Sequence, residues 1–173
     1  MLTFEQLEAF EWVNLDWLLI NEGEGQDLLA ALAPTSTSTA VMNAEEILSK
    51  LRGTKLGGLK GIIMTRGAEG VIASLENGEI VSAGAGKVEG GVKDTTGAGD
   101  CFTGYFATLL STLSTSSPLT AKKLEPILEI ACQAAAMCVE KHGAMESVPS
   151  LKEVKGRMGS KWREGCEWDV LLQ

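Results

Sequence analysis

Short apolar runs alternate along the chain with longer segments whose apolar residues recur every three or four positions. Runs of strand length, rich in Leu, Ile and Val, lie at 17–20, 59–64 and 71–75. Helical spacing is found at 3–12, 26–33, 43–51, 100–113, 121–141 and 151–158. Alternation of strands with helices of this kind predicts an α/β fold.

Polar and glycine-rich stretches separate these elements. Residues 34–39 are a small polar linker, and Asn77-Gly78 predicts a hairpin turn over 76–79. The segment 82–93 has four glycines, so that only Val88 and Val92 could anchor a strand there. Toward the end of the chain, Ser150 is the expected N-cap of the helix at 151–158.

Composition narrows the class of protein. The 173 residues are 45% hydrophobic and 22% charged, which fits one globular domain. A formal net charge of −8 argues against a nucleic-acid or anionic-membrane partner. The single histidine excludes a His-rich metal site, no apolar run is long enough to cross a membrane, and the acidic N-terminal segment is unlike a secretory signal. Four cysteines without a C-x-x-C pair predict reduced thiols and a cytoplasmic protein.

The run Asp94-Thr-Thr-Gly-Ala-Gly-Asp100 carries the strongest chemical signal. Gly97, Ala98 and Gly99 allow a tight turn whose backbone N–H groups face outward at the start of an apolar helix, and such a helix start binds phosphate. Asp100 beside this anion site suggests a general base for phosphoryl transfer. The structural alternative is an N-cap residue after an ordinary glycine turn.

Two further patterns lie where predicted strands end. Asn21 and Glu24 follow the strand at 17–20, at the edge of the sheet where α/β folds bind ligands. From these residues alone, a loop with a helix N-cap is the favoured interpretation. Thr65, Gly67 and Gly70 follow the next strand, where small residues let a ligand approach the backbone. A glycine-rich connection between two strands is the alternative for these.

These motifs, in this order, resemble the ribokinase-like carbohydrate kinases of the phosphofructokinase-B type. The resemblance extends over about 16–154 and covers only the carboxyl-terminal half of such a kinase. It implies a three-layer α/β/α half-domain with a mostly parallel sheet, assigned to 1–158 and followed by a tail at 159–173. Trp162 and Trp168 of the tail are expected to pack on the domain or on a partner. The family's sugar-recognising segments are not identifiable before Asp16.

The resemblance implies an ATP-dependent sugar kinase, with D-ribose, converted into ribose 5-phosphate, as the leading substrate. Asp100 would be the base, and Gly97, Ala98 and Gly99 the anion hole. The other implied contacts with ATP and Mg²⁺ are Asn21 and Glu24 near the metal and phosphates, Thr65, Gly67 and Gly70 at the nucleotide, and Cys132 near the adenine.

A monovalent cation, K⁺, is also implied by the resemblance, beside the anion site. By position, its ligands would be the Asp94 carboxylate, the Thr96 carbonyl, the carbonyls of Cys138, Lys141 and Gly143, and Ser147. From the residues alone, the segment 141–147 is an ordinary helix C-cap and turn.

Three alternatives stay open at this point. The chain could be a kinase for another sugar or for a nucleoside of the same family. It could be a nucleotide-binding module without turnover. Finally, it could be a truncated, inactive or regulatory chain that completes itself with another, which predicts self-association such as a homodimer.

Overall fold

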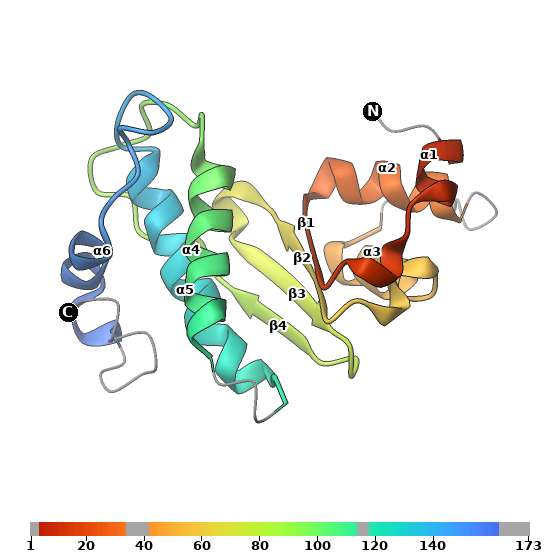
Figure 1. The fold of residues 1–173 in the computed structure, drawn as a ribbon. Coiled ribbons are helices and arrows are strands. Elements are labelled where there is room, and N and C mark those ends of the chain that lie inside the picture. Colours follow the sequence, from red (N-terminus) through yellow and green to blue (C-terminus); the bar gives the residue numbers. More distant parts are fainter. Residues whose placement is uncertain (1–3, 34–41, 114–117, 163–173) are drawn as a thin grey trace. The chain divides into compact units, whose positions relative to one another are not determined.

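The computed structural model describes residues 4–33, 42–113 and 118–162 (Figure 1). The predicted linker at 34–39, Cys166 and Trp168 lie outside the described residues. The helices and strands, in chain order, are α1 (Phe4–Ala9), β1 (Trp17–Asn21), α2 (Glu22–Leu32), α3 (Ala44–Arg52), β2 (Gly61–Thr65), β3 (Val71–Leu75), β4 (Ile80–Ala83), α4 (Ala98–Thr112), α5 (Ala121–Cys138) and α6 (Leu151–Met158). Short 3₁₀ turns lie at Trp12–Asn14, Lys55–Gly58, Gly67–Glu69 and Gly159–Lys161.

The chain divides into two compact units. The first unit comprises Met1–Arg66 and Val71–Val81, and the second comprises Gly67–Gly70 and Ser82–Gln173. Each unit is built by its own packing, so each is described by itself.

The four strands form a sheet in the order β1-β2-β3-β4. β1 is parallel to β2, and β2 is antiparallel to β3, so the sheet is mixed. The predicted turn after β3 is present: Gly78 has φ +84°, and its N–H donates to the Leu75 carbonyl at 2.9 Å. This turn leads into β4, whereas no strand forms around Val88 or Val92. The predicted α/β class is confirmed, and β1, β2 and β3 lie on the three apolar runs, whereas β4 was not predicted.

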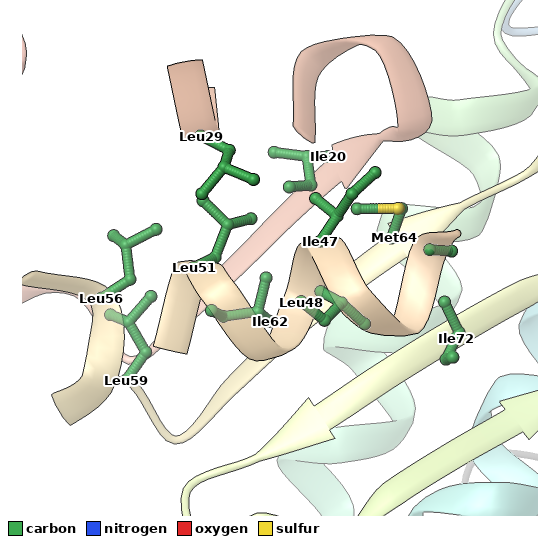
Figure 2. Close-up of a cluster of buried hydrophobic side chains, with 11 residues drawn as sticks. Ile20, Leu29, Ile47, Leu48, Leu51, Leu56, Leu59, Ile62, Met64 and Ile72 are labelled. Carbon is green, nitrogen blue, oxygen red and sulfur yellow. The ribbon is translucent and has the colours of Figure 1, made fainter. Parts of the chain in front are cut away.

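The core of the first unit lies where α2 and α3 pack against the sheet (Figure 2). Apolar residues that recur at helical spacing on α3 meet alternate residues of the strands, because a helix and a strand each present one face to a shared core. Ile47, Leu48 and Leu51, which recur at helical spacing in the helix predicted at 43–51, were expected to face inward and are fully buried. They contact a cluster that includes Ile20, Leu29, Ile62, Met64 and Ile72.

Three helices begin with a capping box, in which an N-cap side chain and a glutamate three residues later satisfy each other's backbone N–H groups. The pairs are Asn21 with Glu24 at α2, Asn43 with Glu46 at α3, and Ser150 with Glu153 at α6. The predicted start of α2 at residue 26 is therefore wrong, because the box at Asn21 starts the helix at Glu22. The prediction for α6, with Ser150 as N-cap, is confirmed.

In the second unit, α5 packs against both α4 and α6. Five apolar residues at helical spacing in and just after α4 were expected to be buried: Phe102, Phe106 and Leu109 are buried, whereas Leu110 and Leu113 are half-buried. Trp162 is buried, and the Lys155 ammonium group lies 5.4 Å from its ring centroid. Helix α5 ends at Cys138 rather than near residue 141. Beyond this residue the chain forms tighter hydrogen bonds, between residues three positions apart. One of them runs from Lys141 N–H to the Cys138 carbonyl at 3.2 Å.

Cys101, Cys132 and Cys138 are buried free thiols. Burial raises the pKa of Cys101 and of Cys132 to about 12, so both thiols stay protonated and unreactive at neutral pH. None of the helices in the described part of the chain has the length and apolar character needed to span a membrane.

Candidate functional site

Helix α4 begins on a left-handed glycine. Gly97 is the N-cap with φ +80°, and a Cβ added there would lie 3.1 Å from the Cα and the Cβ of Ala144. Both the backbone conformation and the close approach of Ala144 require glycine at this position. The turn is closed by two hydrogen bonds, from Ala98 N–H to the Thr95 carbonyl at 3.3 Å and from Cys101 N–H to the Gly97 carbonyl at 2.8 Å.

The remaining N–H groups of this turn are available to a ligand. Within the described ranges, no hydrogen bond engages the N–H of Gly97, Gly99 or Asp100, and no side chain caps the helix. The prediction named Ala98 as a donor, but its N–H is already bonded within the turn. Because α4 is 15 residues long, the positive end of its dipole adds to these donors, and the arrangement suits an anion such as phosphate.

The Asp100 side chain is exposed and lines the same cavity as Gly97. This cavity has a volume of about 600 Å³ and lies between α4 and the segment 144–151. Its walls include Tyr105, Leu109 and Val148. A carboxylate, an uncapped helix start and an apolar wall therefore border one space, which is the arrangement that a base beside a bound phosphate requires.

Asp94, at the start of the motif, is a hydrogen-bond acceptor for two separate segments. Its carboxylate accepts from Thr96 N–H at 2.9 Å and from Gly143 N–H at 3.2 Å. These bonds, with that from Thr96 first, lower the pKa of Asp94. The main chain here is held by α5, because the N–H groups of Lys93 and Asp94 both donate to the Val139 carbonyl, at 2.8 and 3.3 Å.

The predicted K⁺ ligands are partly brought together. Asp94, Thr96 and Gly143 are joined by the hydrogen bonds of the Asp94 carboxylate. Ser147 is buried, donates to the Ala144 carbonyl at 2.9 Å and lies 2.9 Å from the Cys138 sulfur. Among the described residues, no three His, Cys, Asp or Glu side chains group as a metal site, so a cation here would depend on carbonyl oxygens. Oxygen ligands suit a hard cation, and the K⁺ site stays a prediction.

The candidate residues of the first unit also lie together, at the carboxyl ends of two parallel strands. Asn21 is the register partner of Thr65, whose hydroxyl donates to the Ile20 carbonyl at 3.4 Å. Glu24 accepts the Asn21 N–H at 2.8 Å, and its own N–H donates to the Asn21 side chain at 2.9 Å. The N-cap alternative is thus realised, and a magnesium role for the exposed Asn21 and Glu24 stays a prediction.

Gly67 and Gly70 both have positive φ, but their surroundings differ. Around Gly67 (φ +54°) there is open space, whereas a Cβ at Gly70 (φ +87°) would lie 2.2 Å from the Ala83 carbonyl oxygen. We expect Gly70→Ala to lower the free energy of unfolding by about 3 kcal/mol, from left-handed strain and overpacking together. Denaturant unfolding measures this change.

Gly67→Asn is the matched control, because asparagine tolerates the left-handed region and meets no neighbour there. We expect it to change the free energy of unfolding by less than about 1 kcal/mol. Equal losses in the two variants would contradict a steric role that is specific to Gly70.

Cys132, the predicted adenine neighbour, is buried in α5, and its carbonyl lies directly beneath Gly86. Sequence reasoning missed three polar residues of this region: Gln133 on α5, Glu140 two residues beyond its end, and Arg157 on α6. A signal for the first two was available, since they are polar residues in a segment of the sequence that is otherwise mostly apolar.

Comparison with known proteins identifies the family of this chain. Residues 9–151 match the model of the pfkB family of carbohydrate kinases. The ribokinase of Schizosaccharomyces pombe is 34% identical over 146 residues, which are 84% of this chain and 41% of that protein. The structure of Cryptococcus neoformans ribokinase with ADP superposes with a TM-score of 0.73 at 40% identity and covers 91% of this chain and 50% of that one. Arabidopsis thaliana ribokinase with ribose and ATP gives a TM-score of 0.65 at 26% identity, over 86% and 42%.

The chain spans less than half the length of the S. pombe relative and half of the C. neoformans chain. The match nevertheless runs through both units and includes the Asp94–Asp100 motif and the Asn21 and Thr65 strand ends. The chain therefore belongs to the pfkB family of carbohydrate kinases and has the ribokinase-like α/β fold.

Proposed function

We propose that this chain forms the nucleotide-binding part of an ATP-dependent sugar kinase that phosphorylates D-ribose to ribose 5-phosphate. The observation that carries the proposal is the start of α4. There, the N–H groups of Gly97, Gly99 and Asp100 are unbonded, and Gly97 lines the same cavity as Asp100. Membership of a family of carbohydrate kinases supports the proposal.

In this proposal Asp100 accepts the proton of the primary hydroxyl of the sugar as that oxygen attacks the γ-phosphorus, and the bond from the γ-phosphorus to the bridging oxygen breaks to release ADP. The N–H groups at Gly97 and Gly99 bind the phosphate oxygens and stabilise the charge that develops on them. Their direction is fixed by the left-handed Gly97 turn, so little reorganisation is needed during the reaction.

The other predicted residues orient the nucleotide and its ions. Mg²⁺, when bound, neutralises charge on the ATP phosphates, and Asn21 and Glu24 would hold its hydration shell. Thr65, Gly67 and Gly70 would lie along the nucleotide. K⁺, coordinated by oxygens around Asp94, would stabilise the turn that presents the phosphate-binding N–H groups.

D-ribose is favoured as substrate because the similar proteins are ribokinases, one of them with ribose and ATP bound in its structure. A nucleotide-binding module without turnover is the second candidate. The observation that favours it is that the chain spans only 41% of its S. pombe relative.

The test is ADP release by the purified 173-residue chain with Mg²⁺, K⁺ and ATP, run with ribose, with fructose, with adenosine and without acceptor. Calorimetry with Mg·ATP measures binding separately. We expect Mg·ATP to bind and ribose to give the largest release of ADP. Binding without sugar-dependent release would support the second candidate, and absence of nucleotide binding would overturn both.

A further inference from the structure

The segment 86–94, which precedes the phosphate-binding turn, follows α5 closely although it forms no strand. At its start, Gly86 packs directly on the helix backbone. A Cβ there would lie 2.5 Å from the Gln133 Cα and 2.6 Å from the Cys132 carbonyl oxygen. Backbone atoms cannot move away as a side chain can, so glycine is required for this approach.

Gln133 in α5 and Glu140, two residues beyond the end of that helix, bind the backbone of this segment. The Gln133 side-chain oxygen accepts Lys87 N–H at 3.0 Å, and its amide nitrogen donates to the Lys87 carbonyl at 3.0 Å. The Glu140 carboxylate accepts Glu89 N–H at 2.6 Å and also accepts the N–H of Gly90. These two side chains therefore supply hydrogen bonds that a neighbouring strand would provide in a sheet.

The two residues hold one short stretch of backbone. Gln133 and Glu140 are seven positions apart in the sequence, and the backbone groups that they bind lie within four residues, from Lys87 to Gly90. The chain bends at Glu89 and Gly90, where Glu140 binds it. Both ends of this bent stretch are therefore held by side chains.

Arg157 of α6 completes the group. Its guanidinium binds both Glu140 carboxylate oxygens, at 2.9 and 3.1 Å, and its Nε lies 3.4 Å from a Glu89 carboxylate oxygen. Both partners of the pair are largely buried, with side chains 19% and 11% exposed for Arg157 and Glu140. Such two-point, charge-assisted bonds fix geometry better than single bonds do, so Arg157 orients the carboxylate that holds Glu89.

The held segment leads directly into the site. Just beyond Gly90, the N–H groups of Lys93 and Asp94 donate to the carbonyl of Val139, the residue before Glu140. Asp94 then accepts Thr96 N–H, one residue before the Gly97 turn. Hydrogen bonds therefore hold the backbone at short intervals from Lys87 to the phosphate-binding turn at Gly97.

We propose that Gln133, Glu140 and Arg157 are positioning residues, which hold the segment 86–94 on α5 and so set the place of Asp94 and of the phosphate-binding turn at Gly97. This inference rests on the proposed function, because the turn matters for activity only if it binds phosphate. None of the three residues lines the cavity beside Asp100, so they act through the backbone that they hold.

The test compares two double variants that share one change. Arg157→Leu with Glu140→Leu removes both charges and leaves neither unpaired, but it also removes the acceptor for Glu89 N–H. Arg157→Leu with Glu140→Gln is the matched variant, because glutamine keeps an oxygen at that place. Lys152→Leu, an exposed position on α6, controls for the loss of a basic residue from that helix.

Amide hydrogen exchange followed by NMR reports the held segment, and the amides of β2 and β3 report global stability in the same sample. With Glu140→Leu and Arg157→Leu, we expect exchange at Glu89, Lys93, Asp94 and Thr96 to accelerate about tenfold or more, with β2 and β3 changed much less. The affinity for ADP should fall several-fold. The variant with glutamine should recover most of both effects, and Lys152→Leu should show neither.

Acceleration confined to Glu89, with Asp94 and Thr96 unchanged, would overturn the inference, because the anchor would then act only locally. Equal acceleration in β2 and β3 would overturn it as well, by indicating an ordinary loss of stability. If the unmodified chain binds no ADP, the proposed function fails. Even then, the exchange rates at Asp94 and Thr96 would show whether Gln133, Glu140 and Arg157 position the turn.

Discussion

Replacing Asp100 by asparagine is expected to lower ribose-dependent ADP release by about 100-fold or more, because a positioned general base contributes a factor of about 10² to 10⁴. Asparagine keeps the shape of the side chain but cannot accept the proton of the sugar hydroxyl. The affinity for Mg·ATP should be unchanged or slightly higher, because a negative charge beside the phosphate site is removed. Steady-state kinetics and calorimetry measure the two effects separately.

Asp27→Asn is the control, since Asp27 is an exposed aspartate on α2 that has no assigned part in the site. It should keep both turnover and nucleotide affinity. If Asp100→Asn retained turnover within a few-fold, Asp100 would be a helix-start residue only, as the structural alternative holds. A parallel loss of nucleotide affinity and turnover would likewise contradict its assignment as the base.

Replacing Gly97 by valine should damage both the fold and the site. At φ +80°, a β-branched residue is strained, because L-residues with side chains disfavour the left-handed region. Its Cβ would also lie 3.1 Å from the Cα and the Cβ of Ala144. We expect the free energy of unfolding to fall by about 2 to 4 kcal/mol. The affinity for Mg·ATP should fall at least tenfold, because the N–H groups of the turn are redirected.

Gly156→Ala provides the comparison for Gly97→Val. Gly156 lies inside α6, and no atom approaches a Cβ placed there. Alanine should raise the free energy of unfolding by about 0.5 to 1 kcal/mol through better helix propensity, without a change in nucleotide affinity. Calorimetry and denaturant unfolding of both variants check the pair. Unchanged affinity in Gly97→Val would contradict the phosphate role of the turn.

Features that depend on neighbouring residues were predictable from the sequence. The capping residue Ser150 defined the start of α6, and the spacing of Ile47, Leu48 and Leu51 defined the buried face of α3. The Gly97 turn and its helix were also predicted, because glycine and the apolar residues that follow are adjacent in the chain. Such local signals act before tertiary contacts form, which is why they can be found without a structure.

Features that depend on distant residues were not predictable in this way. The end of α5 was placed too late because the carbonyl of Val139, its C-cap residue, accepts the N–H groups of Lys93 and Asp94, which no helical pattern reveals. The contact between Asp94 and Gly143, 49 residues apart, followed only from family resemblance. The pairing of Gln133 with Lys87, 46 residues away, was missed entirely, because each residue looks ordinary in its own segment.

The contacts that hold the segment 86–94 on α5 also determine which substitutions this region can accept during evolution. Its conformation is encoded largely outside itself, in Gln133 and Glu140, which bind its backbone and not its side chains. Substitutions at Lys87 or Val88 should therefore accumulate freely, whereas a change at Gln133 or Glu140 would select for compensation elsewhere. Among related chains, a substitution at Gly86 should occur together with substitutions at the α5 positions that Gly86 contacts. Within the segment, the sequence should vary fastest at residues whose backbone groups are not held by these hydrogen bonds.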